Sequence, residues 1–112
     1  MANPMKGEVE VTLGDDTYKT RLTVDSLIKI EEETGKGIVI LAQRMAEADI
    51  KLSDISTILR YALRGGGNDF DNKKIYQIIS EVGIIEATKV VANLITDTLS
   101  DPNQEKKQQA VV

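Results

Sequence analysis

Cysteine and histidine are both absent from this chain of 112 residues, and their absence narrows the chemistry available to it. Without cysteine there is no disulfide, no thiolate nucleophile and no cysteine-ligated zinc. Without histidine the chain lacks the commonest general base and the commonest transition-metal ligand. Carboxylates, hydroxyls and the cations of lysine and arginine remain as the side chains that a reactive or ligand-binding site would use.

Neighbouring carboxylates occur twice, as Asp15 with Asp16 and as Glu31, Glu32 and Glu33. A general acid–base pair works when its surroundings separate the two pKa values, usually inside a cleft. Consecutive residues on a helix point in different directions, so the three glutamates are typical of a solvated face. We therefore assign neither group a catalytic role.

Ser53, Asp54 and Ser56 place hydroxyl groups beside a carboxylate. The three residues lie at the predicted start of a helix, where acceptor side chains satisfy free backbone amides. A serine nucleophile needs a neighbouring base, and the chain has no histidine to serve as one. The pattern therefore indicates helix capping.

Residues 64–72 resemble two kinds of binding loop and match neither. A P-loop has Gly-x-x-x-x-Gly-Lys-Ser/Thr after a strand, whereas the glycines at 65–67 follow a helical pattern and no Lys-Ser/Thr comes next. A calcium loop that began at Asp69 would need glycine at its sixth position and glutamate at its twelfth, where the chain has Lys74 and Ser80. We interpret the stretch as a helix end and a cap, and we predict no catalytic, cofactor-binding or metal-binding residues and no cofactor.

The bulk composition is that of one ordinary globular domain. Apolar residues make up 41% of the chain and charged residues 29%, which is typical of a soluble protein. The net charge is −4 and the basic residues are scattered, whereas a nucleic-acid binder usually carries a basic stripe. No apolar run approaches the roughly 20 residues of a membrane span, and the first residues do not form a signal peptide. We expect an intracellular protein that binds neither membranes nor nucleic acid.

An antiparallel β-hairpin is predicted at the start of the chain, because apolar and polar residues alternate over residues 7–22 on both sides of a turn signal at 14–16. A two-residue loop would place Glu10 opposite Lys19, and a four-residue loop would place it opposite Arg21. Both registers keep the apolar faces together, so both stay open. A lone hairpin is marginal in water, so helices must cover its apolar face or another chain must join its edge.

Helical periodicity follows the hairpin, with Thr23 and Asp71 as predicted N-caps. The helix near residue 38 is apolar almost all round in its first turn, which is typical of a buried helix. We therefore predict an α+β fold, an N-terminal β-hairpin followed by a cluster of four to five α-helices. The predicted helices cover residues 23 to 35 or 37, 38–47, 53–65, 71–83 and 84–99. The predicted division of the chain is a flexible arm at 1–5, a single domain at 6–100 and a disordered polar tail at 101–112.

Aliphatic residues exceed what one small core requires. One interpretation is a generously buried core, and the other is an interface with like subunits or with a partner helix. On the second interpretation, the helices near residues 38–45 and 84–99 supply the surface. The candidate partner-binding residues are Ile38, Leu41, Met45, Ile85, Val90 and Leu99.

The order of several short motifs resembles the tail assembly proteins of tailed phages and gene transfer agents. The similarity covers roughly residues 2–98, and its motifs are individually weak. They are Ala2-Asn3-Pro4-x-Lys6-Gly7-Glu8-Val9, Tyr18-x-x-Arg21-Leu22-Thr23, Leu27-x-x-x-Glu31-x-x-x-Gly35, Leu59-x-x-Ala62-Leu63-Arg64-Gly65-Gly66, and a later junction at Gly83.

The resemblance implies a tail assembly chaperone, a protein that acts in the bacterial host cytoplasm without catalysing a reaction. Such chaperones bind the tape-measure protein, keep its helices soluble and help to recruit tail tube subunits. Self-association into a ring or spiral through the hairpin edge is a further expectation. Two alternatives stay open: a structural tail component, such as a tube or junction subunit, since some family members are labelled tail tube proteins, and a small regulatory nucleic-acid-binding domain.

Overall fold

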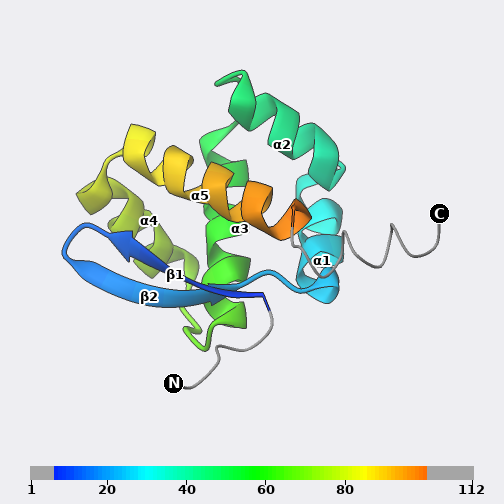
Figure 1. The fold of residues 1–112 in the computed structure, drawn as a ribbon. Helices are drawn as coiled ribbons and strands as arrows, with labels where there is room; N and C mark the ends of the chain where they lie inside the picture. Colours follow the sequence, from blue (N-terminus) through cyan, green and yellow to red (C-terminus); the bar gives the residue numbers. More distant parts are fainter. Residues whose placement is uncertain (1–6, 101–112) are drawn as a thin grey trace.

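A β-hairpin followed by five helices makes up residues 7–100, the part of the chain that this computed structural model describes (Figure 1). The predicted arm at 1–5 and the predicted tail at 101–112 lie outside the described residues. The predicted α+β class and the order of its elements are confirmed. The elements are β1 (Glu8–Leu13), β2 (Asp16–Arg21), α1 (Val24–Thr34), α2 (Ile38–Ala46), α3 (Leu52–Gly65), α4 (Asn72–Val82) and α5 (Ile84–Leu99).

The hairpin adopts the tighter of the two predicted registers. Glu10 pairs with Lys19 and Leu13 pairs with Asp16, which leaves a two-residue loop between the strands. Gly14, the first residue of that loop, has a φ of 69°, a left-handed conformation that glycine adopts without steric cost. The four-residue loop is therefore excluded.

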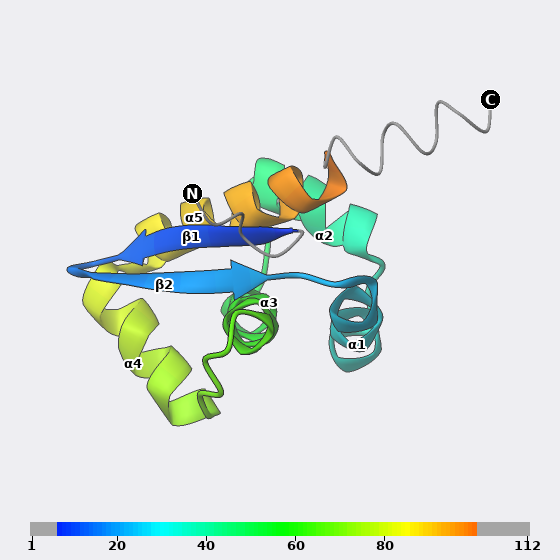
Figure 2. The ribbon, with the colours of Figure 1, turned by 60° about the horizontal axis from the view of Figure 1, so that its bottom comes forward.

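Helices cover the hairpin, as a lone hairpin requires. Figure 2 shows α3 against β2, and α5 also contacts β1. The contact with α3 is made by backbone, because a Cβ on Gly66 would lie 1.9 Å from the carbonyl oxygen of Lys19. The side chain of Asn68 adds a 2.9 Å hydrogen bond from its Nδ2 to the same oxygen. Gly65, the last residue of α3, and Gly66, its C-cap, therefore allow β2 to approach closely, in addition to ending the helix.

Helix α3 is the centre of the core, since it contacts β2, α1, α4 and α5. Its inward face is fully buried and packs with the buried faces of α4 and α5. The described helices include none that combines the length and the apolar character of a membrane span. The buried residues of α3 are Asp54, Ile55, Ser56, Ile58, Leu59, Ala62 and Leu63.

The prediction that α2 is a buried helix is wrong for its outer side. Leu41 and Met45 are 0% and 7% exposed, but Val39 and Ile40 are 57% and 45% exposed. The helix packs against α5 and α1 on one side and faces solvent on the other. Its first turn therefore leaves apolar surface uncovered.

Candidate partner-binding groove

An open apolar groove of about 450 Å³ lies where α3, α4 and α5 meet. Its floor is the buried Ile79, and its sides are the exposed side chains of Leu52, Tyr76 and Ile84. Large apolar side chains scattered singly over a surface are ordinary, whereas a cluster around a depression marks a candidate interaction site. The full lining is Leu52, Ser53, Ser56, Tyr76, Ile79, Ser80 and Ile84.

Local structure brings these side chains together. Tyr76, Ile79 and Ser80 are three and four residues apart on α4, so they share one face of that helix. Gly83 ends α4 and begins α5 with a φ of 99°, which turns the chain and brings Ile84 back beside that face. Leu52 is the first residue of α3, where no earlier helical turn covers it.

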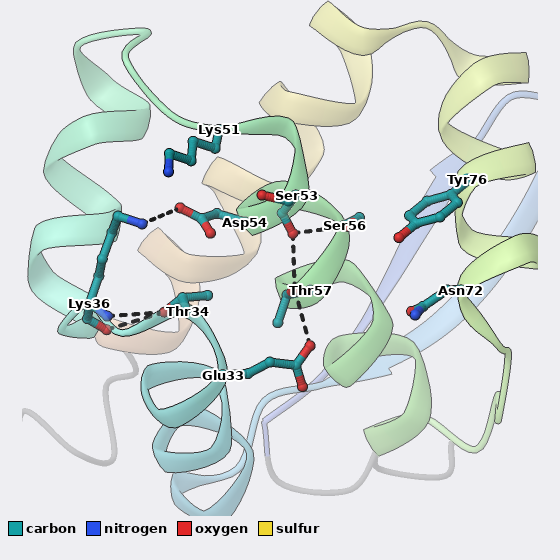
Figure 3. Close-up of a pocket in the computed structure, with 10 residues that line it drawn as sticks. All are labelled: Glu33, Thr34, Lys36, Lys51, Ser53, Asp54, Ser56, Thr57, Asn72 and Tyr76. Atoms are coloured by element: carbon teal, nitrogen blue, oxygen red, sulfur yellow. Dashed lines mark hydrogen bonds and ion pairs between the residues drawn. The ribbon is translucent and has the colours of Figure 1, made fainter.

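A second, polar depression of about 390 Å³ adjoins the groove and shares Ser53, Ser56 and Tyr76 with it (Figure 3). Side chains from α1, the α1–α2 turn, the end of the α2–α3 loop, α3 and α4 line it. The two depressions together form one surface with an apolar half and a polar half. The polar half is lined by Glu33, Thr34, Lys36, Lys51, Ser53, Asp54, Ser56, Thr57, Asn72 and Tyr76.

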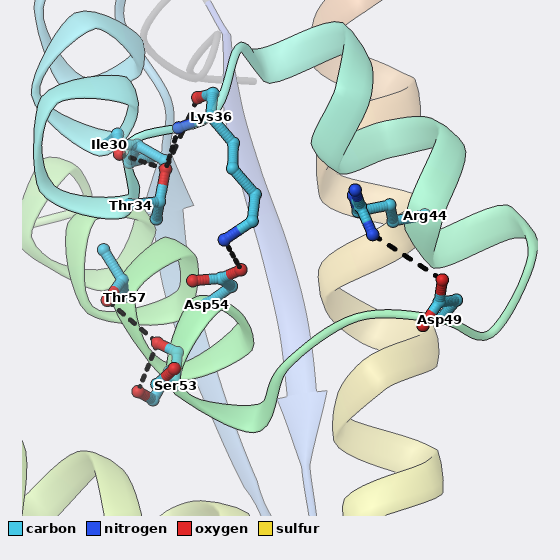
Figure 4. Close-up of polar contacts among 9 residues, drawn as sticks. Ile30, Thr34, Lys36, Arg44, Asp49, Ser53, Asp54 and Thr57 are labelled. Carbon is cyan, nitrogen blue, oxygen red and sulfur yellow. Dashed lines mark hydrogen bonds and ion pairs between the residues drawn. The ribbon is translucent and has the colours of Figure 1, made fainter.

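Two carboxylates in the polar half are held by cations. Lys36 Nζ lies 3.0 Å from Oδ2 of Asp54, and the Asp54 side chain is only 7% exposed (Figure 4). Glu33 accepts hydrogen bonds from Arg60 and Tyr61. Both pairs connect α1 or its following turn to α3, so these carboxylates have structural partners.

The pKa of Glu33 reflects its surroundings. Partial burial raises the pKa of this carboxyl, but hydrogen bonds from Arg60 and Tyr61 and the charge of Arg60 outweigh burial, so the pKa lies below its ordinary value. Burial also lowers the pKa of Arg60, and the bond to Glu33 more than reverses that effect. Both shifts favour the charged pair that holds α1 on α3.

Lys51 is the charged residue of the polar half that has no partner for its ammonium group within residues 7–100. The hydroxyl of Tyr76 makes no hydrogen bond within the same residues, and it points toward the α3 side of the depression (Figure 3). The surface therefore offers apolar contact in one half and unused hydrogen-bond donors in the other. Among the described residues no group of three acidic side chains is placed to hold a metal ion.

The sequence-predicted partner residues do not form one surface. Leu41 and Met45 belong to the core, where no partner reaches them, and Ile38 packs half-buried against it. Val90 lines a separate depression of about 260 Å³ between β1 and α5. Buried side chains were chosen because periodicity alone does not show which side of an apolar helix is covered.

Two of the predicted residues, Ile85 and Leu99, are exposed. Ile85 is 75% exposed and follows Ile84, which lines the groove. Leu99 lies about 21 Å farther along α5, given a rise of about 1.5 Å per residue. Neither residue lines the groove.

Sequence reasoning missed the groove residues Leu52, Tyr76 and Ile84. Leu52 and Ile84 lie at helical spacing from the core residues of their own helices, and Tyr76 lies outside the apolar stripe of α4. One available signal was that both aliphatic residues are the first of their helices. A helical side chain leans toward the N-terminus of its helix, so the first one extends past the helix end.

The fold and this surface define a small α+β domain with an open apolar groove. A family model described as "Phage tail tube protein, GTA-gp10" matches residues 6–101. The chain therefore belongs to this family of phage and gene-transfer-agent tail proteins, which includes tail assembly chaperones. No curated protein and no solved structure matches the chain. The resemblance found in the sequence motifs is confirmed at the level of the family.

Proposed function

We propose that this chain is a tail assembly chaperone that binds apolar helical segments of the tape-measure protein in the host cytoplasm while the tail is built. The observation that carries the proposal is the exposed apolar groove at the junction of α3, α4 and α5. An amphipathic helix that lays its apolar face into such a groove is a recurring mode of recognition. Family membership supports the tail as the setting, and tail tube subunits are the proposed second partner.

The size of the groove supports reversible binding. Leu52, Tyr76 and Ile84 are each about half exposed, so their complete burial would contribute roughly 1 kcal/mol apiece. Association costs at least about 4 kcal/mol in lost translational and rotational freedom. A few further contacts therefore give modest affinity, which suits a chaperone that must release its client.

Co-expression with the tape-measure protein of the same gene cluster tests the proposal. We expect the soluble fraction of the tape-measure protein to rise when this chain is present, because its apolar helices are covered. The chain carrying Leu52→Ser with Ile84→Ser should give a smaller rise than the chain carrying Val24→Ser with Ile40→Ser, which alters two equally accessible apolar side chains on α1 and α2. A tape-measure protein that stays equally insoluble with and without the unaltered chain rejects the chaperone function.

A structural role in the tail is the second candidate, because the printed description of the matching family is "Phage tail tube protein". A subunit of the tube would remain in finished particles, whereas a chaperone would leave before completion. Mass spectrometry of purified tails distinguishes the two. Detection of this chain in amounts comparable to those of the other tube proteins supports the structural role.

A further inference from the structure

The polar half of the depression restricts the kind of helix that the groove accepts. We propose that the groove binds an amphipathic helix that carries an acidic side chain one turn away from its apolar anchors, and that Lys51 pairs with that acidic group. The inference rests on the proposed function and assigns a partner chemistry to the same site. It concerns recognition only and involves no covalent step.

The two halves are close enough to be reached by one helix. Ser53, Ser56 and Tyr76 line both depressions, so no ridge of other residues separates them. Residues three or four apart on a partner helix lie about 5–6 Å from each other on one face. An apolar side chain in the groove therefore places a side chain one turn away over the polar half.

Charge determines what that second side chain is. Of the four charged residues that line the polar half, Lys36 and Asp54 pair with each other, and Glu33 pairs with Arg60. Lys51 is left, and a carboxylate is the group that complements an unpaired ammonium. The chain as a whole has a net charge of −4 and repels a uniformly acidic partner. The preference is therefore for a single acidic side chain beside the anchors.

Tyr76 connects the two halves. Its ring lines the apolar groove, and its hydroxyl points toward the polar half (Figure 3). Tyrosine is enriched at interfaces because it combines a large apolar face with one hydrogen-bond donor. Here the same side chain can pack on an apolar anchor and offer its hydroxyl to a polar group of the partner, on the side of the depression opposite Lys51 (Figure 3).

Binding of a model peptide to the full chain tests the inference without the tape-measure protein. The probe is a fluorescent, Ala-rich helical peptide of about 20 residues with two leucines four apart and one glutamate a turn beyond them. Two matched peptides replace the glutamate by glutamine or by lysine. Fluorescence anisotropy gives the Kd of each peptide, at low and at high salt.

We expect the glutamate peptide to bind the unaltered chain roughly two- to fivefold more tightly than the glutamine peptide at low salt, with a smaller ratio at high salt. Lys51→Gln should remove that ratio, whereas Lys29→Gln, which neutralises an exposed lysine on α1, should keep it. Lys51→Glu should reverse the preference and favour the lysine peptide. Leu52→Ser should weaken every peptide about tenfold, and Ile40→Ser should not, although both positions are 45% exposed.

Equal binding of the glutamate and glutamine peptides overturns the inference, and so does a preference that Lys51→Gln leaves unchanged. If groove substitutions convert an oligomer of this chain into a monomer and leave peptide binding unaltered, the occupant is a second copy and the inference is again wrong. These results leave the co-expression test untouched. If the chain solubilises the tape-measure protein but shows no preference among the peptides, the proposed function stands and only the acidic-partner inference is rejected.

Discussion

Gly66 shows how a single residue position sets the spacing of two elements. A Cβ at this position would lie 1.9 Å from the carbonyl oxygen of Lys19, and a Cβ at Gly65 would lie 2.0 Å from that of Arg21. Both obstacles are strand backbone, which cannot move aside as the end of a flexible side chain can. The sequence interpretation of the glycine run as a helix end is correct but incomplete. The close approach of β2 depends on the packing of β2 against the end of α3, which no local sequence pattern reveals.

Replacing Gly66 with alanine should lower the free energy of unfolding by about 3 kcal/mol or more, because the methyl group forces β2 away from α3. Urea denaturation followed by circular dichroism measures the change. Gly37→Ala is the matched control, since a Cβ there meets no atom closer than 3.8 Å, and it should change stability by less than about 0.5 kcal/mol. Equal effects of the two substitutions would show that the backbone approach is not required.

Helix starts were the best predicted features at the scale of elements. Thr23 accepts a hydrogen bond from the amide of Ser26, and Asp71 accepts one from that of Lys74, so both predicted N-caps are confirmed. The bounds of α5 also agree with the prediction. Capping and helical periodicity act over a few residues, so sequence alone reveals them.

The pairing of α1 with α3 was not predicted, because it joins side chains 27 residues apart, Glu33 and Arg60. Glu33 was assigned to a solvated face, and its side chain is indeed 42% exposed. Its carboxylate nevertheless accepts hydrogen bonds from Arg60, Tyr61 and Thr57 of α3. Spacing along one helix cannot show which residue of another helix will lie opposite.

The bonds that Glu33 accepts from α3, which we call the Glu33 clamp, give a pH-dependent contribution to stability. Because the pKa of Glu33 is lower in the folded chain than in the unfolded chain, the contribution is fully present above the unfolded pKa of about 4.3 and is lost as the pH falls through the folded pKa. Solvent screening at this half-exposed carboxylate keeps it below about 1 kcal/mol. We expect Glu33→Gln to reduce the difference between the Tm at pH ~6 and at pH ~3, measured by calorimetry.

Glu32→Gln is the control for that measurement, because Glu32 is exposed on the same helix and makes no side-chain bond within residues 7–100. Glu32→Gln should leave the difference between the two Tm values nearly unchanged. If both substitutions reduce that difference equally, Glu33 acts only through its negative charge, and its hydrogen bonds to α3 do not stabilise the fold.

At the scale of the whole molecule, the groove is built by three helices that are separated in sequence. Leu52, Tyr76 and Ile84 meet only because the chain turns at Gly83 between α4 and α5, and because both helices pack on α3. Each was interpretable from sequence as a core or surface residue of its own helix. The structure buries Leu41 and Met45 in the core and leaves other aliphatic residues exposed. Which aliphatic residues are covered depends on the packing of the helices, so the sequence could not show it.

Truncation tests the predicted division of the chain into a domain and a polar tail. Residues 101–109 carry no apolar side chain except that of Pro102, so they offer little area to bury, and removing 101–112 should change the Tm by less than about 2 °C. Removing 94–112 also deletes Leu94 and Ile95, which are 3% and 0% exposed, and their loss should cost several kcal/mol, at about 2–5 kcal/mol for each core side chain. Differential scanning fluorimetry of both truncated chains separates the outcomes. A fall of more than about 5 °C in the Tm after removal of residues 101–112 would show that these residues stabilise the folded domain. The domain would then extend beyond residue 101, where the family match ends.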